Sequence, residues 1–257
     1  SAPWPLPSAG ASLQLRDAAQ DTVRVANWGV GGTNARPAQT LPLLVYTNSW
    51  KYMQVSNLDG VNWTATNYND AGWPGGRGLL AYEGNAAIRP LTNTWLNDPT
   101  RATNNVVSGH GYYFRTTVVA TNDLTGFTLN ADARLDDGGV FYVNGVEAER
   151  VRHADGVVVT NTSITTDIVP GGDAINSDLF TLDAGLFQGG TNVIAVEVHQ
   201  NQLGSSDITF GLALTANFAG YTNLVAQATP GAANSVATNL PAFPPLWLNE
   251  AQADNTS

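Results

Sequence analysis

The dipeptide Asn144-Gly145 constrains the fold more than any other feature of the sequence. An apolar run at residues 140–143 precedes it, and a second run starts at Val146. Asn and Gly both tolerate the positive φ that a type I′ turn requires, so the pattern predicts a β-hairpin. The Asp-Asp-Gly-Gly sequence at residues 136–139 is expected to form a tight turn before the first strand. Such a hairpin in mid-chain indicates antiparallel β architecture.

Strand-like runs separated by Gly, Asn and Pro recur through the middle of the chain. No window longer than ~10 residues shows a 3.6-residue apolar period with caps, although residues 183–187 can form one helical turn. The pattern predicts an all-β fold, an antiparallel β-sandwich of the jelly-roll kind with short extra strands at both termini. The expected sandwich strands are residues 50–53, 79–82, 112–119, 127–135, 140–143, 177–182, 191–200 and 208–215.

Three segments of the chain differ in composition. Residues 1–42 contain short strand-like runs at 11–16 and 23–28, followed by a Gly/Asn/Pro linker at 31–39. Residues 43–219 hold the predicted sandwich. Residues 220–257 are rich in Ala, Asn, Thr and Pro and end in a short strand and a polar stretch. Because such short strands cannot build a core alone, we expect the terminal segments to complete another structure.

The charge balance excludes several classes of partner. The 257 residues carry 11 Lys and Arg against 21 Asp and Glu, a formal net charge of −10. Binding of nucleic acid or of an anionic membrane needs clustered basic residues, so neither is expected. Cations and neutral ligands such as sugars are compatible with this charge. No apolar run approaches the ~20 residues of a membrane span, so membrane insertion is not expected either.

The rest of the composition points to a location outside the cell. Only 12% of residues are charged, so the polar surface must come from Asn, Thr, Ser and Gln, as is common in secreted proteins. There is no cysteine, which excludes disulfides and thiolate metal sites. We expect an extracellular or bacterial cell-surface location.

An ordered series of short motifs runs through the middle segment. The motifs are Trp50-x-Tyr52, Asn69-Asp70-Ala71-Gly72-Trp73 leading to Gly78-Leu79-Leu80-Ala81-Tyr82, Tyr113-Phe114-Arg115, residues 136–145, and residues 192–200 with Ser205-Ser206-Asp207. Taken in order over residues 43–218, they resemble a galactose-binding-like β-sandwich of secreted bacterial multidomain proteins, similar to carbohydrate-binding modules. The resemblance implies a jelly roll that binds a glycan.

The two ends resemble a different family. The run at residues 12–17, together with Ala26-Asn27-Trp28, is similar to the close of a lamin-tail-like immunoglobulin-fold domain. The run at residues 246–254 is similar to the beginning of one. The chain therefore resembles a sandwich flanked by two partial lamin-tail-like segments.

These unfinished ends suggest an assembly hypothesis. Either the chain is a piece of a longer tandem array, or the C-terminal strand of one copy completes the N-terminal sheet of the next. The second alternative would produce an open head-to-tail filament, since unpaired edge strands need cover. Its contacts would come from Leu13 and Leu15 at one end and from Leu246, Trp247 and Leu248 at the other. Removing residues 246–257 should then leave only monomers, and unchanged assembly would contradict the hypothesis.

Asp136 and Asp137 are adjacent carboxylates with three alternative roles. They can fix a turn by accepting hydrogen bonds from backbone N–H groups. They can instead bind calcium or sugar hydroxyls, because an oxygen-rich turn on an acidic protein suits a hard cation. Paired acid/base catalysis is the weakest alternative, because no second carboxylate is tied to them by spacing and neighbours on a strand point to opposite faces.

Other polar residues carry weaker catalytic signals. Glu197 and His199 share a strand face, but no H-E-x-x-H or H-x-H spacing supports a zinc site with His110 or His153. A hydrogen-bonded structural histidine is the preferred interpretation. The run at residues 205–207 lacks the G-x-S-x-G elbow, so a Ser-His-Asp hydrolase is not expected.

The aromatic residues give the strongest indication of binding. Trp63, Tyr68 and Trp95 lie in polar, loop-like surroundings, and flat rings of this kind can stack on the C–H face of a sugar. The alternative is that the rings close the ends of the sandwich. Trp50 and Trp73 fit the family pattern and are expected in the core.

Three classes of function follow from these observations. The first is a non-catalytic extracellular binding or adhesion module for carbohydrate. The second is a structural subunit of an extracellular filament or surface assembly, that is, a homo-oligomer joined through its terminal strands. A hydrolase comes third, because no catalytic set of residues is found, and we expect no enzymatic activity.

Overall fold

The computed structural model describes residues 4, 12–20, 22–31, 34–99, 111–120, 124–202 and 204–223. The chain divides into two compact units. One is made of Ser1–Ala38 with Gly220–Ser257, and the other is Gln39–Ala219. Each unit is best understood by itself.

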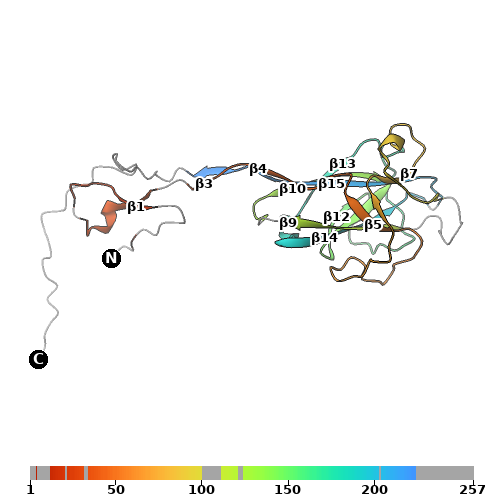
Figure 1. The fold of residues 1–257 in the computed structure, drawn as a ribbon, viewed down its shortest axis with the longest axis horizontal. Coiled ribbons are helices and arrows are strands. Elements are labelled where there is room, and N and C mark those ends of the chain that lie inside the picture. The colour runs from red at the N-terminus through yellow and green to blue at the C-terminus, as the bar shows by residue number, and fades with distance from the viewer. Residues whose placement is uncertain are drawn as a thin grey trace, which may run out of the picture. The chain divides into compact units, whose positions relative to one another are not determined.

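The larger unit consists of two six-stranded sheets, which Figure 1 shows as two layers. Sheet I has the order β13-β10-β15-β7-β8, with β4 also paired to β15, and sheet II has the order β12-β11-β14-β9-β5-β6. The β7–β8 pair is parallel, whereas the other described pairs are antiparallel. The predicted antiparallel β-sandwich is therefore confirmed. The strands are β4 (Gln39–Leu44), β5 (Ser49–Met53), β6 (Gly75–Arg77), β7 (Leu80–Tyr82), β8 (Thr94–Trp95), β9 (Tyr112–Ala120), β10 (Thr128–Asp136), β11 (Gly138–Val143), β12 (Val146–Val151), β13 (Asp178–Leu182), β14 (Gly190–His199) and β15 (Ile208–Phe218).

Helical structure is limited to single turns in the described part of the chain. The three 3-10 helices are η1 (Val25–Asn27), η2 (Arg89–Leu91) and η3 (Ala184–Leu186). The last confirms the helical turn expected at residues 183–187, and the Asp183 carboxylate caps it by accepting from Gly185 N at 2.8 Å. Within the described residues, no helix is long and apolar enough to cross a membrane.

The core between the sheets follows the alternation of apolar residues along the strands. Trp50 on β5 meets Phe210 on β15 edge-on, with ring centroids 4.8 Å apart, and Phe114 on β9 stacks on the same ring at 4.1 Å. The alternate residues of β10 and β15 that face this core are Leu129, Ala131, Ala133, Leu135, Ile208, Phe210, Leu212, Leu214 and Ala216.

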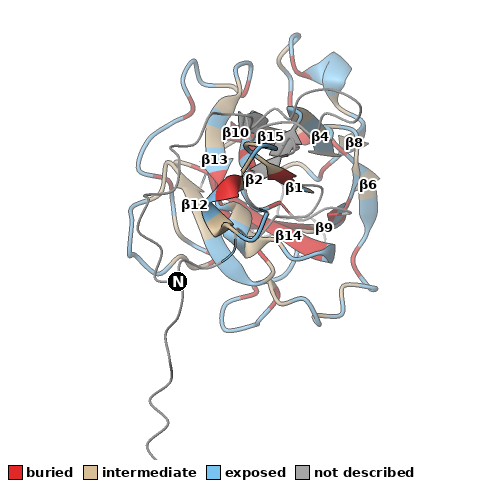
Figure 2. Ribbon diagram, turned by 90° about the vertical axis from the view of Figure 1, so that its left-hand side faces the viewer, coloured by how far each residue is buried: buried red, intermediate tan, exposed pale blue. Residues whose placement is uncertain are grey.

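Strand β14 departs from simple alternation. From Asn192 to His199 every residue is buried, as the red colour along this strand in Figure 2 indicates. One face of the strand meets the core, and the other lies beneath a second apolar cluster that includes Trp63, Trp73 and Tyr113. The outer face of sheet II is therefore covered, which places polar side chains of β14 inside the protein.

The central hairpin forms as predicted. Strands β11 and β12 pair in antiparallel register, and the two residues between them have φ values of 52° (Asn144) and 85° (Gly145). Positive φ at both positions is the requirement of a type I′ turn. The Asn144 side chain also fixes the turn to β14, because its Oδ1 accepts from Val193 N at 2.9 Å.

Among its described residues, the smaller unit contains two short antiparallel strand pairs. Strand β1 (Ser12–Leu15) pairs with β2 (Trp28–Gly31), and β3 (Asn34–Arg36) pairs with β16 (Tyr221–Asn223). Extra strands expected at the N-terminal end are thus present, with different bounds. The short strand expected within residues 246–254 lies outside the described residues, and β16 falls in the stretch predicted as a linker.

The sequence-based bounds in the N-terminal segment are wrong for a local reason. A strand was expected at residues 23–28 and a linker at 31–39, but η1 occupies part of the first and β3 part of the second. The buried Asn27 amide accepts from Asp17 N and donates to Asp17 O, both at 2.8 Å, and this pairing bends the chain into a turn. The linker residues become strands because they find backbone partners far away in the sequence, and the predicted boundary at residue 43 falls inside β4.

Candidate functional site

Asp137 lies between β10 and β11, and its carboxylate anchors two loops. Its side chain is 2% exposed, and its two carboxylate oxygens accept from the backbone N–H groups of Val169 and Asn201, each at 2.8 Å. Arg152 donates to the Asp137 carbonyl at 2.6 Å. The prediction that a carboxylate of this turn binds backbone N–H groups is confirmed for Asp137, and its oxygens are already used by these donors.

Asp136 lies in a different environment. It ends β10, is 1% exposed, and its Oδ2 has no hydrogen-bond partner among the described residues. Burial, followed by the charges of Asp207, Asp137 and Glu83, raises the pKa of Asp136 to about 9. A buried carboxyl surrounded by other carboxyls is the opposite of a satisfied turn residue.

Strand register explains why distant carboxylates meet Asp136. In sheet I, Asp136 is the cross-strand partner of Thr209, and both belong to the outward-facing alternation because Leu135 and Phe210 face the core. Asp207 lies two residues before Thr209 and therefore on the same face. Since Ile208 pairs with Tyr82, continuing this register places Asp207 opposite Glu83.

These side chains form an acidic cluster, defined here as Glu83, Asp136, Asp173 and Asp207. One ligand oxygen from each of Glu83, Asp173 and Asp207 lies within 4.8 Å of the others. Burial and the neighbouring Asp207 and Asp173 charges raise the pKa of Glu83, and burial chiefly raises that of Asp207. The cluster has the donor set of a hard-cation site, because it offers only oxygen atoms.

A loop folds over this end of sheet I and contributes Asp173. Arg134, on the outward face of β10, donates to the carbonyl oxygens of Ala174, at 2.9 Å, and of Ile175. Asn85 Nδ2 donates to Asp173 Oδ2 at 2.9 Å, which ties the loop to the segment after β7. With the Asp137–Val169 bond, these contacts fix the covering loop at residues 169–175.

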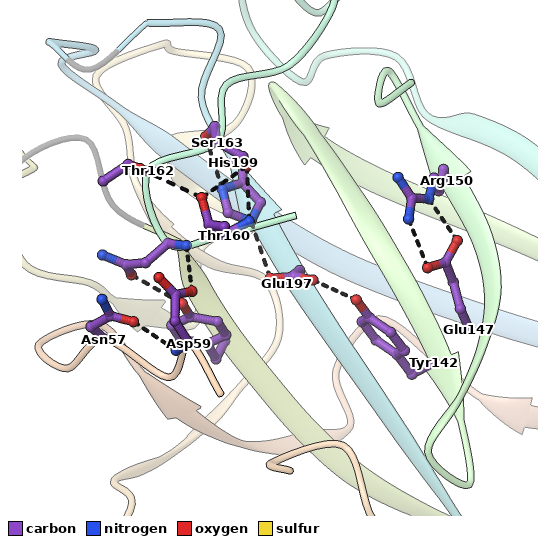
Figure 3. A network of polar contacts seen from close by, with 12 residues as sticks. Asn57, Asp59, Tyr142, Glu147, Arg150, Thr160, Thr162, Ser163, Glu197 and His199 are labelled. Carbon is purple, nitrogen blue, oxygen red and sulfur yellow. Dashed lines mark hydrogen bonds and ion pairs between the residues drawn. The ribbon is translucent and has the colours of Figure 1, made fainter. Parts of the chain in front are cut away.

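A polar network occupies the covered outer face of sheet II. Figure 3 shows Glu197 between Tyr142 and His199, and each of its carboxylate oxygens has a partner. Tyr142 OH donates to Oε1 at 2.5 Å, and His199 Nε2 lies 3.2 Å from Oε2. The other ring nitrogen of His199 lies 3.1 Å from the Ser163 carbonyl oxygen. The interpretation of His199 as a hydrogen-bonded structural histidine is confirmed.

The network borders a small cavity. Its volume is about 210 Å³, and Trp63, Tyr113, Tyr142, Asp59 and Glu197 are among the residues that line it. The polar atoms here are largely engaged with one another: Tyr113 OH donates to Asn161 Oδ1 at 3.0 Å, and Asp59 Oδ1 accepts from Asn161 N at 2.7 Å. We interpret this region as a structural plug.

A larger and more open groove lies at the edge of sheet II, on β5, β6 and β9. Its volume is about 510 Å³. Arg115 is 3% exposed and is held by Asp70, whose Oδ2 lies 2.9 Å from Nε. Lys51 donates to the Trp73 carbonyl oxygen at 3.1 Å. The lining is completed by Ser49, Trp50, Gly75, Gly76, Arg77, Thr116 and Thr117. The groove thus combines fixed charges with hydroxyl groups and bare backbone.

The structure separates the three aromatic candidates. Trp63 is 6% exposed and packs edge-on against Tyr113 and Tyr142, so the expectation of an exposed ring is wrong. The polar sequence context of Trp63 suggested an exposed ring, but the loop that carries it folds back onto sheet II. Tyr68 is half-buried and packs against Trp73. Trp95 is 49% exposed, as expected for a binding ring. Trp50 and Trp73 are buried, which confirms their core assignment.

Only some of the residues expected to mediate assembly are among the described residues. Leu13 on β1 is 37% exposed and Leu15 is half-buried. Leu246, Trp247 and Leu248 lie outside the described residues. Head-to-tail assembly through these segments stays a prediction.

Sequence reasoning missed Glu83 and Asp173 entirely. It considered Asp207 only as part of a hydrolase motif, and it paired Asp136 with Asp137 because they are neighbours in the chain. One signal was available, since Glu83 directly follows one apolar strand and Asp207 directly precedes another. Their pairing depends on strand order, which the sequence did not provide.

Comparison with known proteins gives little further information. No family model matches the chain, and no curated protein matches it. Solved structures that match part of this chain include a Bacteroides uniformis beta-glucuronidase (TM-score 0.42, 11% identity), which is matched over 70% of this chain and 18% of that one. They also include an uncultured Clostridium sp. beta-glucuronidase (0.42, 12%, covering 71% and 30%) and a Bacteroides vulgatus beta-glycosidase (0.38, 15%, covering 69% and 20%). The chain spans less than a third of each of these proteins, and likenesses this weak carry no argument about ligand or activity.

Proposed function

We propose that this chain is a non-catalytic extracellular binding module whose ligand is a carbohydrate, held in the groove on β5, β6 and β9. The observation that carries the proposal is the groove itself. Its volume of about 510 Å³ lies within the roughly 300–1,000 Å³ typical of small-ligand sites. The resemblance of the ordered sequence motifs to galactose-binding-like domains supports a sugar as the ligand class.

The lining chemistry fits sugar hydroxyl groups, which both donate and accept hydrogen bonds. Lys51 and Arg77 supply donors, whereas Asp70, whose side chain is 30% exposed and is held by the buried Arg115, supplies an acceptor. The Arg115–Asp70 pair is held rigidly by further bonds from Arg115 to the carbonyls of Trp63 and Ala65. Fixed polar groups bind with a smaller entropic cost than mobile ones.

An exposed ring lies on strand β8, outside the residues that line the groove itself. Trp95 is on β8, and the preceding residue, Thr94, donates from its hydroxyl to the Arg77 carbonyl at 2.8 Å. Strand β8 therefore adjoins β6, the edge strand that lines the groove. A half-exposed indole at this position can receive the apolar face of a pyranose while the polar lining binds its hydroxyls.

A hydrolytic role has less support in the described residues. Ser205 Oγ donates to Asp207 at 3.1 Å, whereas the His199 ring faces Glu197 and Ser163. The serine and the histidine are thus engaged with different partners and do not form the nucleophile–base contact that acyl transfer requires.

The proposal is tested on a glycan array, followed by titration calorimetry with the best-binding glycan. Trp95→Ala should weaken binding by about tenfold, which corresponds to roughly 1.4 kcal/mol, and Lys51→Met should also weaken it. Trp4→Ala is a matched control, since Trp4 is 48% exposed and lies in the other unit. Absence of binding on the array, or equal losses in the Trp4 and Trp95 variants, would refute the proposal.

A further inference from the structure

The acidic cluster on sheet I has the spacing of a metal site. The ligand oxygens of Glu83, Asp173 and Asp207 all lie within 4.8 Å of one another. Two oxygens on opposite sides of an ion bound at about 2.4 Å are separated by about 4.8 Å, so one ion can contact all three. Spacing alone, however, is also found in acidic groups that bind no ion.

A second observation concerns buried oxygen atoms that lack partners. Glu83 is 5% exposed, and its Oε2 has no hydrogen-bond partner within the described part of the chain. The same holds for Asp136 Oδ2 and Thr209 Oγ1, in residues that are 1% and 0% exposed. Asp136 and Thr209 are cross-strand partners on the face that carries the cluster. Unsatisfied buried oxygens are rare because each costs free energy, and several together on one face indicate a missing ligand.

The charges around the cluster have the same sign. The strongest electrostatic effects on Asp136 come from Asp207, Asp137 and Glu83, which are all carboxylates. Arg134, the basic residue on this face of β10, donates to backbone carbonyls of the covering loop instead. Like charges at this separation repel strongly in a buried site, and a bound cation removes that cost.

We propose that Glu83, Asp173 and Asp207 bind one calcium ion beside the buried carboxyl of Asp136. A donor set of oxygen alone suits calcium, which takes six to eight oxygen ligands in flexible geometry, whereas magnesium demands near-ideal octahedral geometry and keeps several waters. Zinc prefers nitrogen and sulfur ligands. The site differs from the predicted pair, because Asp137 uses its oxygens on Val169 and Asn201.

The ion would link two strands of sheet I to the covering loop. Glu83 directly follows β7, Asp207 directly precedes β15, and Asp173 belongs to the loop at residues 169–175. Calcium binding should therefore stabilise the fold. It is independent of the proposed glycan groove, which lies on sheet II.

The experiment measures thermal unfolding and calcium binding of the full chain. Protein treated with EDTA is compared with the same protein in excess Ca²⁺ or Mg²⁺, and Ca²⁺ binding is measured by calorimetry. At calcium concentrations of 100 times Kd, Tm should rise by about 5–10 °C, and the same concentration of Mg²⁺ should shift it less.

Variants separate a specific site from a general ion effect. Asp207→Asn should abolish the Ca²⁺-dependent rise in Tm, and in EDTA it should melt above the wild type because one repelling charge is gone. Asp155→Asn removes an exposed carboxylate elsewhere and should retain the full calcium response. If Asp207→Asn fails to fold, calorimetry on the wild type still decides the question.

Two outcomes would overturn the proposal. One is the absence of calorimetric Ca²⁺ binding together with an unchanged Tm, which would mean that protons alone neutralise the cluster. The other is an equal calcium response in wild-type and Asp207→Asn protein, which would place the ion elsewhere.

Discussion

The buried carboxylates on the two outer faces of the sandwich have opposite hydrogen-bonding environments. Glu197 on sheet II and Glu83 beside sheet I are each 5% exposed. Both oxygens of Glu197 have partners, Tyr142 and His199, whereas Glu83 has one oxygen without a partner and faces Asp207 and Asp173. Glu197 and Glu83 are therefore equally buried but differ in whether their oxygens have partners. A satisfied carboxylate holds a fold together, and an unsatisfied one in an acidic cluster is the basis of the proposed calcium site.

Each face is covered by a loop, but the covers differ in composition. The cover of sheet II carries Trp63 and Trp73, which form one apolar cluster with Tyr113 beside the polar network. The cover of sheet I, residues 169–175, is held by the hydrogen bonds of Asp137 and Arg134. One cover is fastened mainly by apolar contact and the other mainly by polar contact, so the two should respond differently to substitution.

The largest effect is expected from Trp63→Ala. Removing this buried indole leaves a cavity between the covering loop and sheet II and should lower the free energy of unfolding by about 3–5 kcal/mol. Trp95→Ala is the control, because its exposed ring should contribute within about 0.5 kcal/mol. Urea unfolding measures both. Similar losses in the two variants would contradict the burial of Trp63.

The next effect concerns the cover of sheet I. Asp137→Ala removes the acceptor for Val169 N and Asn201 N and leaves one buried and one partly buried donor unpaired, at a cost of about 3 kcal/mol. Asp183→Ala, which removes an exposed bond to Gly185 N, should cost less than about 1 kcal/mol. Chemical denaturation compares them, and hydrogen exchange should show Val169 losing protection first. Unchanged exchange at Val169 would show that Asp137 does not anchor this loop.

Two matched substitutions test the difference between the two faces, because they should change the stability of the protein in opposite directions. Glu197→Gln should destabilise the protein by about 2 kcal/mol, because it weakens charge-assisted bonds to Tyr142 and His199. Glu83→Gln, measured in EDTA, should stabilise it by about 1 kcal/mol, because it removes a charge from the acidic cluster. Urea midpoints in one buffer give both values. If both substitutions changed the stability in the same direction, the proposed difference between the two faces would be wrong.

The last prediction is a pH dependence and concerns His153. Burial and the neighbouring His199 lower its pKa to about 4, with Glu197, Glu147 and Arg150 as the other charges that face it. Because the folded pKa lies below the ordinary value of 6.5, the unfolded chain takes up the proton first. Stability from this group is thus complete above about pH 6.5 and is lost as pH falls toward 4.

That pH dependence is measured as Tm between pH 7 and 4 for the wild type and for His153→Gln. The variant lacks the titrating group, so its Tm should fall less over this interval. Parallel curves for the two proteins would show that His153 does not carry the effect.

The amino-acid sequence determined the sandwich and its central hairpin. Alternating apolar residues and turn residues such as Asn144-Gly145 act locally, so the strands could be predicted from neighbours a few positions away. The turn role of Asp137 was predicted for the same reason, whereas the core positions of Trp50 and Trp73 were predicted from the resemblance to galactose-binding-like domains. Local hydrogen bonds of Asn27, by contrast, overrode the strand pattern in the N-terminal segment.

Only the tertiary structure decided which side chains meet on the outer faces. Trp63 is buried because its loop folds onto sheet II, a long-range contact that its polar sequence context does not indicate. Glu83, Asp173 and Asp207 meet because β7 and β15 are neighbours in sheet I and a distant loop covers them. Strand order and loop packing depend on contacts between residues far apart in the chain, so the acidic cluster exists only once the whole sandwich has formed.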